Sequence, residues 1–147
     1  MNKKELLSKY KKVIKKINKK IDCVNHGGCG VFALELGKLL KKQGIEFDYV
    51  MLFSSFDEDD KTYVKDLMKN NMVRDFNFET SWTHIVIKVG KKYIDGESIT
   101  KTLDKVGLTM TEEFLENLVN QEMYWNDTFD RNQTPKIQKI LKKSLAD

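Results

Sequence analysis

Cys29 is the residue best suited to covalent chemistry, because it follows Gly27-Gly28 and opens an expected helix over residues 29–42. Unpaired backbone N–H groups and the positive end of the helix dipole favour an anion there, and therefore the nucleophilic thiolate. Flanking glycines, including Gly30, leave the sulfur accessible to a substrate carbonyl. The nearby N–H groups could also stabilise a developing oxyanion. The position therefore predicts a reactive thiol.

A thiol nucleophile is helped by an acid–base partner, and the chain holds only two histidines, His26 and His84. His84 opens a predicted strand, and Asp95 ends the next one, eleven residues later. We expect His84 to take the thiol proton and later to protonate the leaving group. Asp95 would hold the ring in the useful tautomer and stabilise its charged form. The predicted catalytic residues are Cys29, His84 and Asp95.

The register of the predicted hairpin can be worked out from its turn. If residues 90–91 form a two-residue turn, Val86 pairs with Asp95 and His84 pairs with Glu97. His84 and Asp95 then share one face as diagonal neighbours, roughly 7–8 Å apart at the backbone and within side-chain reach. Glu97 is the alternative carboxylate in the same register. The other face is apolar and should face the core: Ile85, Ile87, Val89 and Ile94.

The elements that must position these residues follow from periodicity and turn signals. Helices are predicted over 3–21, 29–42, about 61–69, 111–124 (capped by Thr109 or Thr111) and from Thr134-Pro135 onward. Strands are predicted over 45–53, 84–89 and 92–95, and a loop over 54–60. The pattern indicates one α+β domain, residues 1–147, with the cysteine helix packed on a small antiparallel sheet and flanked by the terminal helices.

Composition limits the other classes of function. The chain has 147 residues and a formal net charge of +4, an excess too small to be typical of nucleic-acid-binding proteins. No run of about 18 apolar residues occurs, so we expect no membrane span. The N-terminus lacks the pattern of a secretory signal, which predicts a cytoplasmic protein with reduced thiols. Small size and abundant lysine are typical of phage or AT-rich bacterial genomes, so a phage-encoded protein acting in the bacterial cytosol is one expectation.

Cys23, His26 and Cys29 are spaced closely enough to raise two alternatives. Zinc would need a fourth ligand, and the sequence has no second pair of cysteines that could supply one. A disulfide between the two cysteines would form only on oxidation and would inactivate the thiol. We therefore predict no metal and no organic cofactor.

These motifs, taken in order, resemble the transglutaminase-like branch of the papain-like cysteine peptidases. The resemblance covers roughly residues 25–99: the segment Gly28 to Ala33, a helix ending before Gly44-Ile45, a strand, then His84 and Asp95. It implies a papain-like fold and acyl transfer through an acyl-enzyme, since the branch includes peptidases, transglutaminases, deamidases and arylamine acetyltransferase-like enzymes.

The resemblance also implies other parts of the site. The papain group places an oxyanion-hole glutamine upstream of its cysteine, but none occurs in the six residues before Cys29. Asn25 is the only amide there, so Asn25 and Gly30 are the candidate oxyanion donors. His26, Gly28 and Trp82 are candidate residues of the substrate cleft.

The sequence thus predicts a thiol hydrolase of the cysteine peptidase type, acting on an amide or isopeptide bond of a protein, peptide or small amide. Deamidation or acyl transfer on the same triad is one alternative. A non-enzymatic binding or inhibitor module that keeps the fold is another. A third, nucleic-acid binding through the basic N-terminal helix, would show affinity that falls steeply with salt.

Overall fold

The computed structural model describes residues 2–22, 28–53, 58–72, 82–100, 106–120 and 130–145, and over these the chain is α+β, as predicted. The helices are α1 (Lys3–Lys20), α2 (Cys29–Lys42), α3 (Glu58–Lys69), α4 (Glu112–Val119) and α5 (Thr134–Leu145), with a 3-10 turn at Arg131–Gln133 just before α5. The strands are β1 (Asp48–Phe53), β2 (Trp82–Val89), β3 (Lys92–Ile94), β4 (Ile99–Thr100) and β5 (Val106–Met110).

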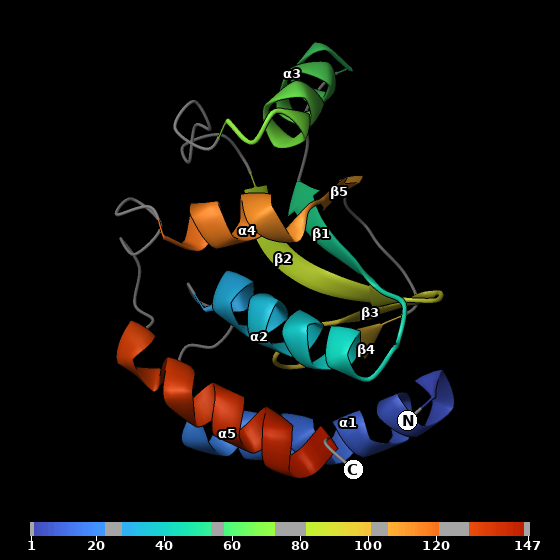
Figure 1. Cartoon of the computed structure of the whole chain (residues 1–147), viewed down its shortest axis with the longest axis vertical. Helices are drawn as coiled ribbons and strands as arrows, with labels where there is room; N and C mark the ends of the chain where they lie inside the picture. Colours follow the sequence, from blue (N-terminus) through green and yellow to red (C-terminus); the bar gives the residue numbers. More distant parts are fainter. Residues whose placement is uncertain are drawn as a thin grey trace.

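The described strands form one antiparallel sheet in the order β4-β3-β2-β1-β5. Helix α2 packs along β2, and α5 packs against α2. Helices α1 and α5 lie side by side on the side of α2 away from the sheet, whereas α3 lies at the other end of the molecule (Figure 1). Among the described helices, none combines the length and apolar character needed to cross a membrane. The main core therefore surrounds α2.

Helix α1 forms because its N-terminal cap and its apolar stripe both favour a helix over the same residues. The Asn2 side chain accepts a hydrogen bond from the Glu5 N–H at 2.9 Å, which satisfies one donor of the first turn. Four buried side chains recur at helical spacing: Leu6, Tyr10, Val13 and Ile17. Lys19 and Lys20 complement the negative end of the helix dipole. One face of α1 thus enters the core, and the lysines remain on the other.

Helix α2 has the predicted bounds, and glycine explains where it ends. Gly44 has φ +71, a left-handed conformation that costs a residue without Cβ little. Its N–H donates to the Lys41 carbonyl at 3.2 Å, and the Ile45 N–H donates to the Leu40 carbonyl at 3.0 Å. This is a Schellman motif, which satisfies carbonyls that the helix end leaves unpaired. The cysteine helix is therefore well defined at its C-terminus.

Several predicted bounds are wrong. Helix α3 begins at Glu58, inside the segment predicted as a loop, and β1 begins at Asp48 rather than at residue 45. Helix α4 ends at Val119, earlier than predicted. Its cap is Thr111, whose hydroxyl oxygen accepts from the Phe114 N–H at 3.0 Å. Thr109 lies instead in β5, and neither β4 nor β5 was predicted.

Candidate active site

Cys29 is the first residue of α2 and is almost fully buried, with 4% of its surface exposed. The N-cap residue before it is Gly28, which has no side chain to accept hydrogen bonds from the first turn. The first backbone N–H groups of a helix have no acceptor inside the helix, and here they lie at the end of α2 that holds the sulfur. Gly30, the second residue of α2, is buried in the same turn. The cysteine therefore lies at the positive end of a buried helix dipole.

His84 and Asp95 meet where the β2–β3 ladder ends. The hairpin has the predicted register from Val89–Lys92 to Ile87–Ile94, with Gly90 in the turn at φ +61. Beyond Ile94 the strands no longer pair, and His84 Nε2 lies 2.8 Å from Asp95 Oδ2. Both side chains are mostly buried, with 17% of His84 and 14% of Asp95 exposed. The predicted contact between these two residues is present.

The path of the chain after Ile94 differs from the prediction. Val86–Asp95 and His84–Glu97 are not ladder pairs, because the Asp95 N–H donates to the Ser98 carbonyl at 3.1 Å and turns the chain back. Glu97 is exposed, so the alternative carboxylate is wrong. The predicted core face of the hairpin is confirmed, because four of its residues are buried: Ile85, Ile87, Val89 and Ile94.

The Asp95 carboxylate is held in place through both of its oxygens. Oδ1 accepts from the Glu97 N–H at 2.7 Å and from the Ser98 N–H at 2.8 Å. The Ser98 hydroxyl adds a longer contact of 3.3 Å to the same oxygen. Oδ2 is left for His84. Since the turn fixes the carboxylate, it also fixes the orientation of the imidazole ring that it contacts.

The charges of His84 and Asp95 stabilise each other. Burial alone lowers the pKa of His84, but hydrogen bonds with Asp95 and with Cys29, and the charges of both, raise it from 6.5 to about 9. Burial raises the pKa of Asp95, but the hydrogen bonds from His84, Glu97 and Ser98 outweigh it and lower the pKa below its usual value. At neutral pH the pair is therefore an imidazolium and a carboxylate. Asp95 occupies Nε2, which leaves Nδ1 for the thiol.

The structure describes the other predicted residues only in part. Cys23, Asn25 and His26 lie outside the described residues, as do the zinc and disulfide alternatives that depend on them. The backbone of Trp82 begins β2 opposite Phe53, and its side chain is not among those that the structure describes. Among the residues that the structure describes, no group of three metal-ligating side chains comes together.

Sequence reasoning missed Tyr10 as part of the site. Its hydroxyl donates a hydrogen bond to the backbone carbonyl of Asp95, and its ring packs against Phe32 of α2 with 6.2 Å between centroids. Tyr10 is fully buried, and this burial together with the charge of Asp95 raises the pKa of its hydroxyl. The sequence places Tyr10 in an apolar stripe. The one signal in the sequence was the hydroxyl, because a buried tyrosine hydroxyl usually has a hydrogen-bond partner.

Gln133 was also missed, and it holds the end of α1. Its Oε1 accepts from the Asp22 N–H at 2.9 Å, and its Nε2 donates to the Asp22 carbonyl at 3.0 Å. Gln133 is 8% exposed, so an unsatisfied amide there would be costly. This pair of bonds fixes the chain seven residues before Cys29 against the start of α5.

We expect Tyr10→Phe to slow alkylation of Cys29 at pH 6 while the protein remains folded. The change removes only the hydroxyl and leaves the Asp95 carbonyl without its buried donor, a loss of about 1–3 kcal/mol. Without this hydrogen bond Asp95 should be held less firmly, which weakens its contact with His84. We therefore expect alkylation of Cys29 to be roughly fivefold slower. Tyr63→Phe is the matched control, since Tyr63 is 55% exposed on α3. Equal rates in both variants, with equal pH profiles, would assign Tyr10 a purely structural role.

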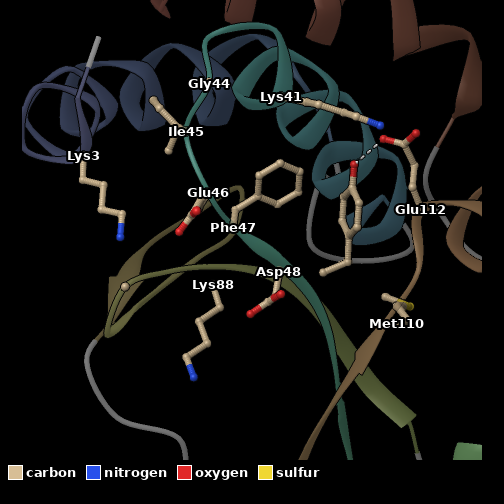
Figure 2. A pocket seen from close by; sticks show the side chains of 12 residues that line it. Lys3, Lys41, Gly44, Ile45, Glu46, Phe47, Asp48, Lys88, Met110 and Glu112 are labelled. Atoms are coloured by element: carbon tan, nitrogen blue, oxygen red, sulfur yellow. Dashed lines mark hydrogen bonds between the residues drawn. The ribbon is translucent and has the colours of Figure 1, made fainter.

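The hollow shown in Figure 2 lies away from this site. It has a volume of about 710 Å³ and lies beside the start of β1, between α1, the end of α2 and the first residue of α4. Tyr49 donates a hydrogen bond to Glu112 Oε1 at 2.9 Å on its wall. Gly37 permits this contact, because a Cβ there would lie 2.2 Å from the Tyr49 hydroxyl. None of Cys29, His84 and Asp95 lines this hollow.

Comparisons of the chain with protein-family models, with curated proteins and with solved structures found no match. Any function must therefore be argued from the geometry of the site.

Proposed function

We propose that this protein is a cysteine-dependent acyl-transfer enzyme that hydrolyses an amide or isopeptide bond with Cys29, His84 and Asp95. The fold would be the papain-like fold in its transglutaminase-like form. One observation carries the proposal: a single imidazole is hydrogen-bonded to a fixed carboxylate, 2.8 Å away, and interacts with a cysteine at a helix N-terminus, which contributes to its raised pKa. Such a chain of nucleophile, base and orienting group is the arrangement that activates a thiol for attack on a carbonyl.

In the first half of the reaction, the thiolate sulfur of Cys29 attacks the carbonyl carbon and a C–S bond forms. The charge moves to the carbonyl oxygen, where backbone N–H groups of the first turn of α2 could donate to it. Collapse of this tetrahedral intermediate breaks the C–N bond, and the imidazolium of His84 gives its proton to the departing nitrogen. The products are a free amine and a thioester on Cys29.

In the second half, neutral His84 takes a proton from a water molecule that attacks the thioester. Collapse breaks the C–S bond, releases the carboxylic acid and restores the thiolate–imidazolium pair. Water gives hydrolysis of an amide or isopeptide, or deamidation if the amide is a glutamine or asparagine side chain. An amine in place of water gives acyl transfer. The identity of the attacking molecule therefore decides between the related reactions.

The proposal predicts a thioester on Cys29. We expect a panel of peptide p-nitroanilides and active esters, quenched in acid, to include one that adds the mass of its acyl group to the intact protein. The adduct should be absent in Cys29→Ala, which has no sulfur to acylate there, and present in Cys23→Ala. Added hydroxylamine should convert the adduct to a hydroxamate and so report acyl transfer. An adduct that survives in Cys29→Ala, or is absent from the wild type with every compound, contradicts the proposal.

A further inference from the structure

Charge is distributed very unevenly over the fold. Helices α1 and α5 together carry thirteen lysines and one acidic residue, Glu5, which is a net charge of +12. The whole chain has a net charge of +4, so the remaining residues carry −8. The modest total therefore conceals two strongly basic helices and a remainder that is acidic on balance.

The lysines of α1 follow a regular pattern of doublets. Eight of them are exposed and occur as pairs separated by multiples of four residues: Lys3-Lys4, Lys11-Lys12, Lys15-Lys16 and Lys19-Lys20. Four residues advance a helix by about 6 Å and return nearly to the same side. Because each such step also turns the helix by about 40°, the doublets form two neighbouring oblique rows of ammonium groups that wind across the solvent side of a helix about 27 Å long.

Helix α5 lies beside α1 and adds further exposed lysines to this surface. Its four lysines are all exposed: Lys136, Lys139, Lys142 and Lys143. The two helices lie side by side (Figure 1), and the bonds between Gln133 and Asp22 join the start of α5 to the end of α1. We call these twelve exposed lysines of α1 and α5 the lysine face.

The positive charge of the lysine face is not balanced by ion pairs with the described residues. No ion pair joins any of its lysines to a residue that the structure describes. Like charges four residues apart destabilise a helix by about 0.2–0.5 kcal/mol per pair. The apolar sides of both helices are already buried in the core, including Val13 and Ile17 of α1 and Ile137 and Leu141 of α5. The face therefore offers regularly spaced charge and no apolar surface to insert into a bilayer.

We propose that the lysine face binds the phosphodiester backbone of a nucleic-acid duplex without reading its sequence. Each strand of a duplex carries one phosphate for about every 3.4 Å of axis, so a helix of about 27 Å spans the axial length of about eight base pairs. Lysines bind phosphates as point charges and fix position rather than specificity. The −8 charge elsewhere would be repelled by the same polyanion and would orient the protein with α1 and α5 inward.

The test is fluorescence anisotropy with a labelled DNA duplex of about 20 base pairs across a salt series. At physiological salt of about 150 mM we expect a dissociation constant between about 1 and 100 µM, the range of sequence-independent binding, and tighter binding at about 50 mM. The variant Lys11→Gln/Lys15→Gln/Lys19→Gln removes three members of one row. It should bind at least about tenfold more weakly, and its plot of log affinity against log salt should be shallower by about 0.9 for each phosphate that is no longer neutralised.

The matched control is Lys65→Gln/Lys69→Gln/Lys91→Gln, which removes the same charge from exposed positions outside the lysine face. It should bind like the wild type. Equal weakening in both variants, absence of binding at low salt, or binding to vesicles of anionic lipid in preference to the duplex would each overturn the proposal. Neither variant alters Cys29, His84 or Asp95, so this result is independent of the proposed chemistry.

Discussion

Replacement of His84 by alanine should strongly lower the reactivity of Cys29 toward iodoacetamide at low pH. In the wild-type protein we expect the alkylation rate to be nearly constant between pH 6 and pH 8. In His84→Ala the rate should rise about tenfold per pH unit until it levels off near pH 8.5, as for an ordinary thiol. At pH 6 the variant should react at least about tenfold more slowly.

The physical reason is the charge of the imidazole. His84 has a pKa of about 9, raised in part by its interaction with Cys29, so we expect an imidazolium near the sulfur throughout this pH range. An ordinary thiol is about 300-fold less ionised at pH 6 than a full thiolate. A thiolate of higher pKa is a better nucleophile, so the two rates at pH 6 should differ by less than this roughly 300-fold difference in ionisation. The shape of the pH profile is therefore a more decisive test than the rate at a single pH.

The measurement needs a single reporting thiol and a matched histidine control. We would place all variants in a Cys23→Ala background and follow Cys29 by intact mass. His26→Ala removes the other histidine of the chain and should leave the profile within about twofold of the wild type. Identical profiles in the His84 and His26 variants, both rising about tenfold per pH unit up to about pH 8.5, would contradict the thiolate–imidazolium pair.

The sequence was informative about this site wherever local signals control the structure. The start of α2 at Cys29 follows from glycines ahead of an apolar helical stripe, and its end follows from Gly44. The β2–β3 turn follows from Gly90 at a position with positive φ. Because a tight turn fixes the register of the strands it joins, the proximity of His84 and Asp95 could be predicted from a count of residues.

Prediction failed where contacts between distant segments decide the outcome. Tyr10 reaches the Asp95 carbonyl across 85 residues, and nothing in the local pattern of α1 indicates that contact. Strand β5 is short and contains Gly107, and it forms because β1 offers an edge to pair with. The ladder ends at Ile94 because the Asp95 side chain stabilises a turn there. The alternation of residues along the strand does not indicate this turn.

Asp95→Asn should lower turnover of any substrate by about 100-fold or more, because an amide leaves the imidazole in the wrong tautomer. The amide NH₂ of asparagine would donate to Nε2 of His84, where the Asp95 carboxylate oxygen now accepts. The proton of the neutral ring would then reside on Nδ1, the nitrogen left for Cys29. Such a ring cannot take a proton from the thiol or from water. Glu97→Gln is the matched control, since Glu97 is exposed and contacts Asp95 only through its backbone N–H.

The same substitution should change how stability depends on pH, which separates its electrostatic effect from a loss of folding. The pKa of His84 is raised from 6.5 to about 9, so its contribution is fully present below pH 6.5 and is lost as the pH rises toward 9. This contribution is at most about 3 kcal/mol, because one pKa unit corresponds to about 1.36 kcal/mol. Urea midpoints should therefore fall between pH 6 and pH 9 in the wild type and in Glu97→Gln.

In Asp95→Asn the carboxylate no longer opposes the burial of His84, so we expect the pKa of His84 to fall toward or below 6.5, as read from NMR titration of its ring. The alkaline loss of stability should shrink with it. A variant with lower turnover but an unchanged His84 titration would mean that Asp95 holds the ring in place without supporting its charge. A variant with unchanged turnover would remove Asp95 from the mechanism and leave a Cys29–His84 dyad.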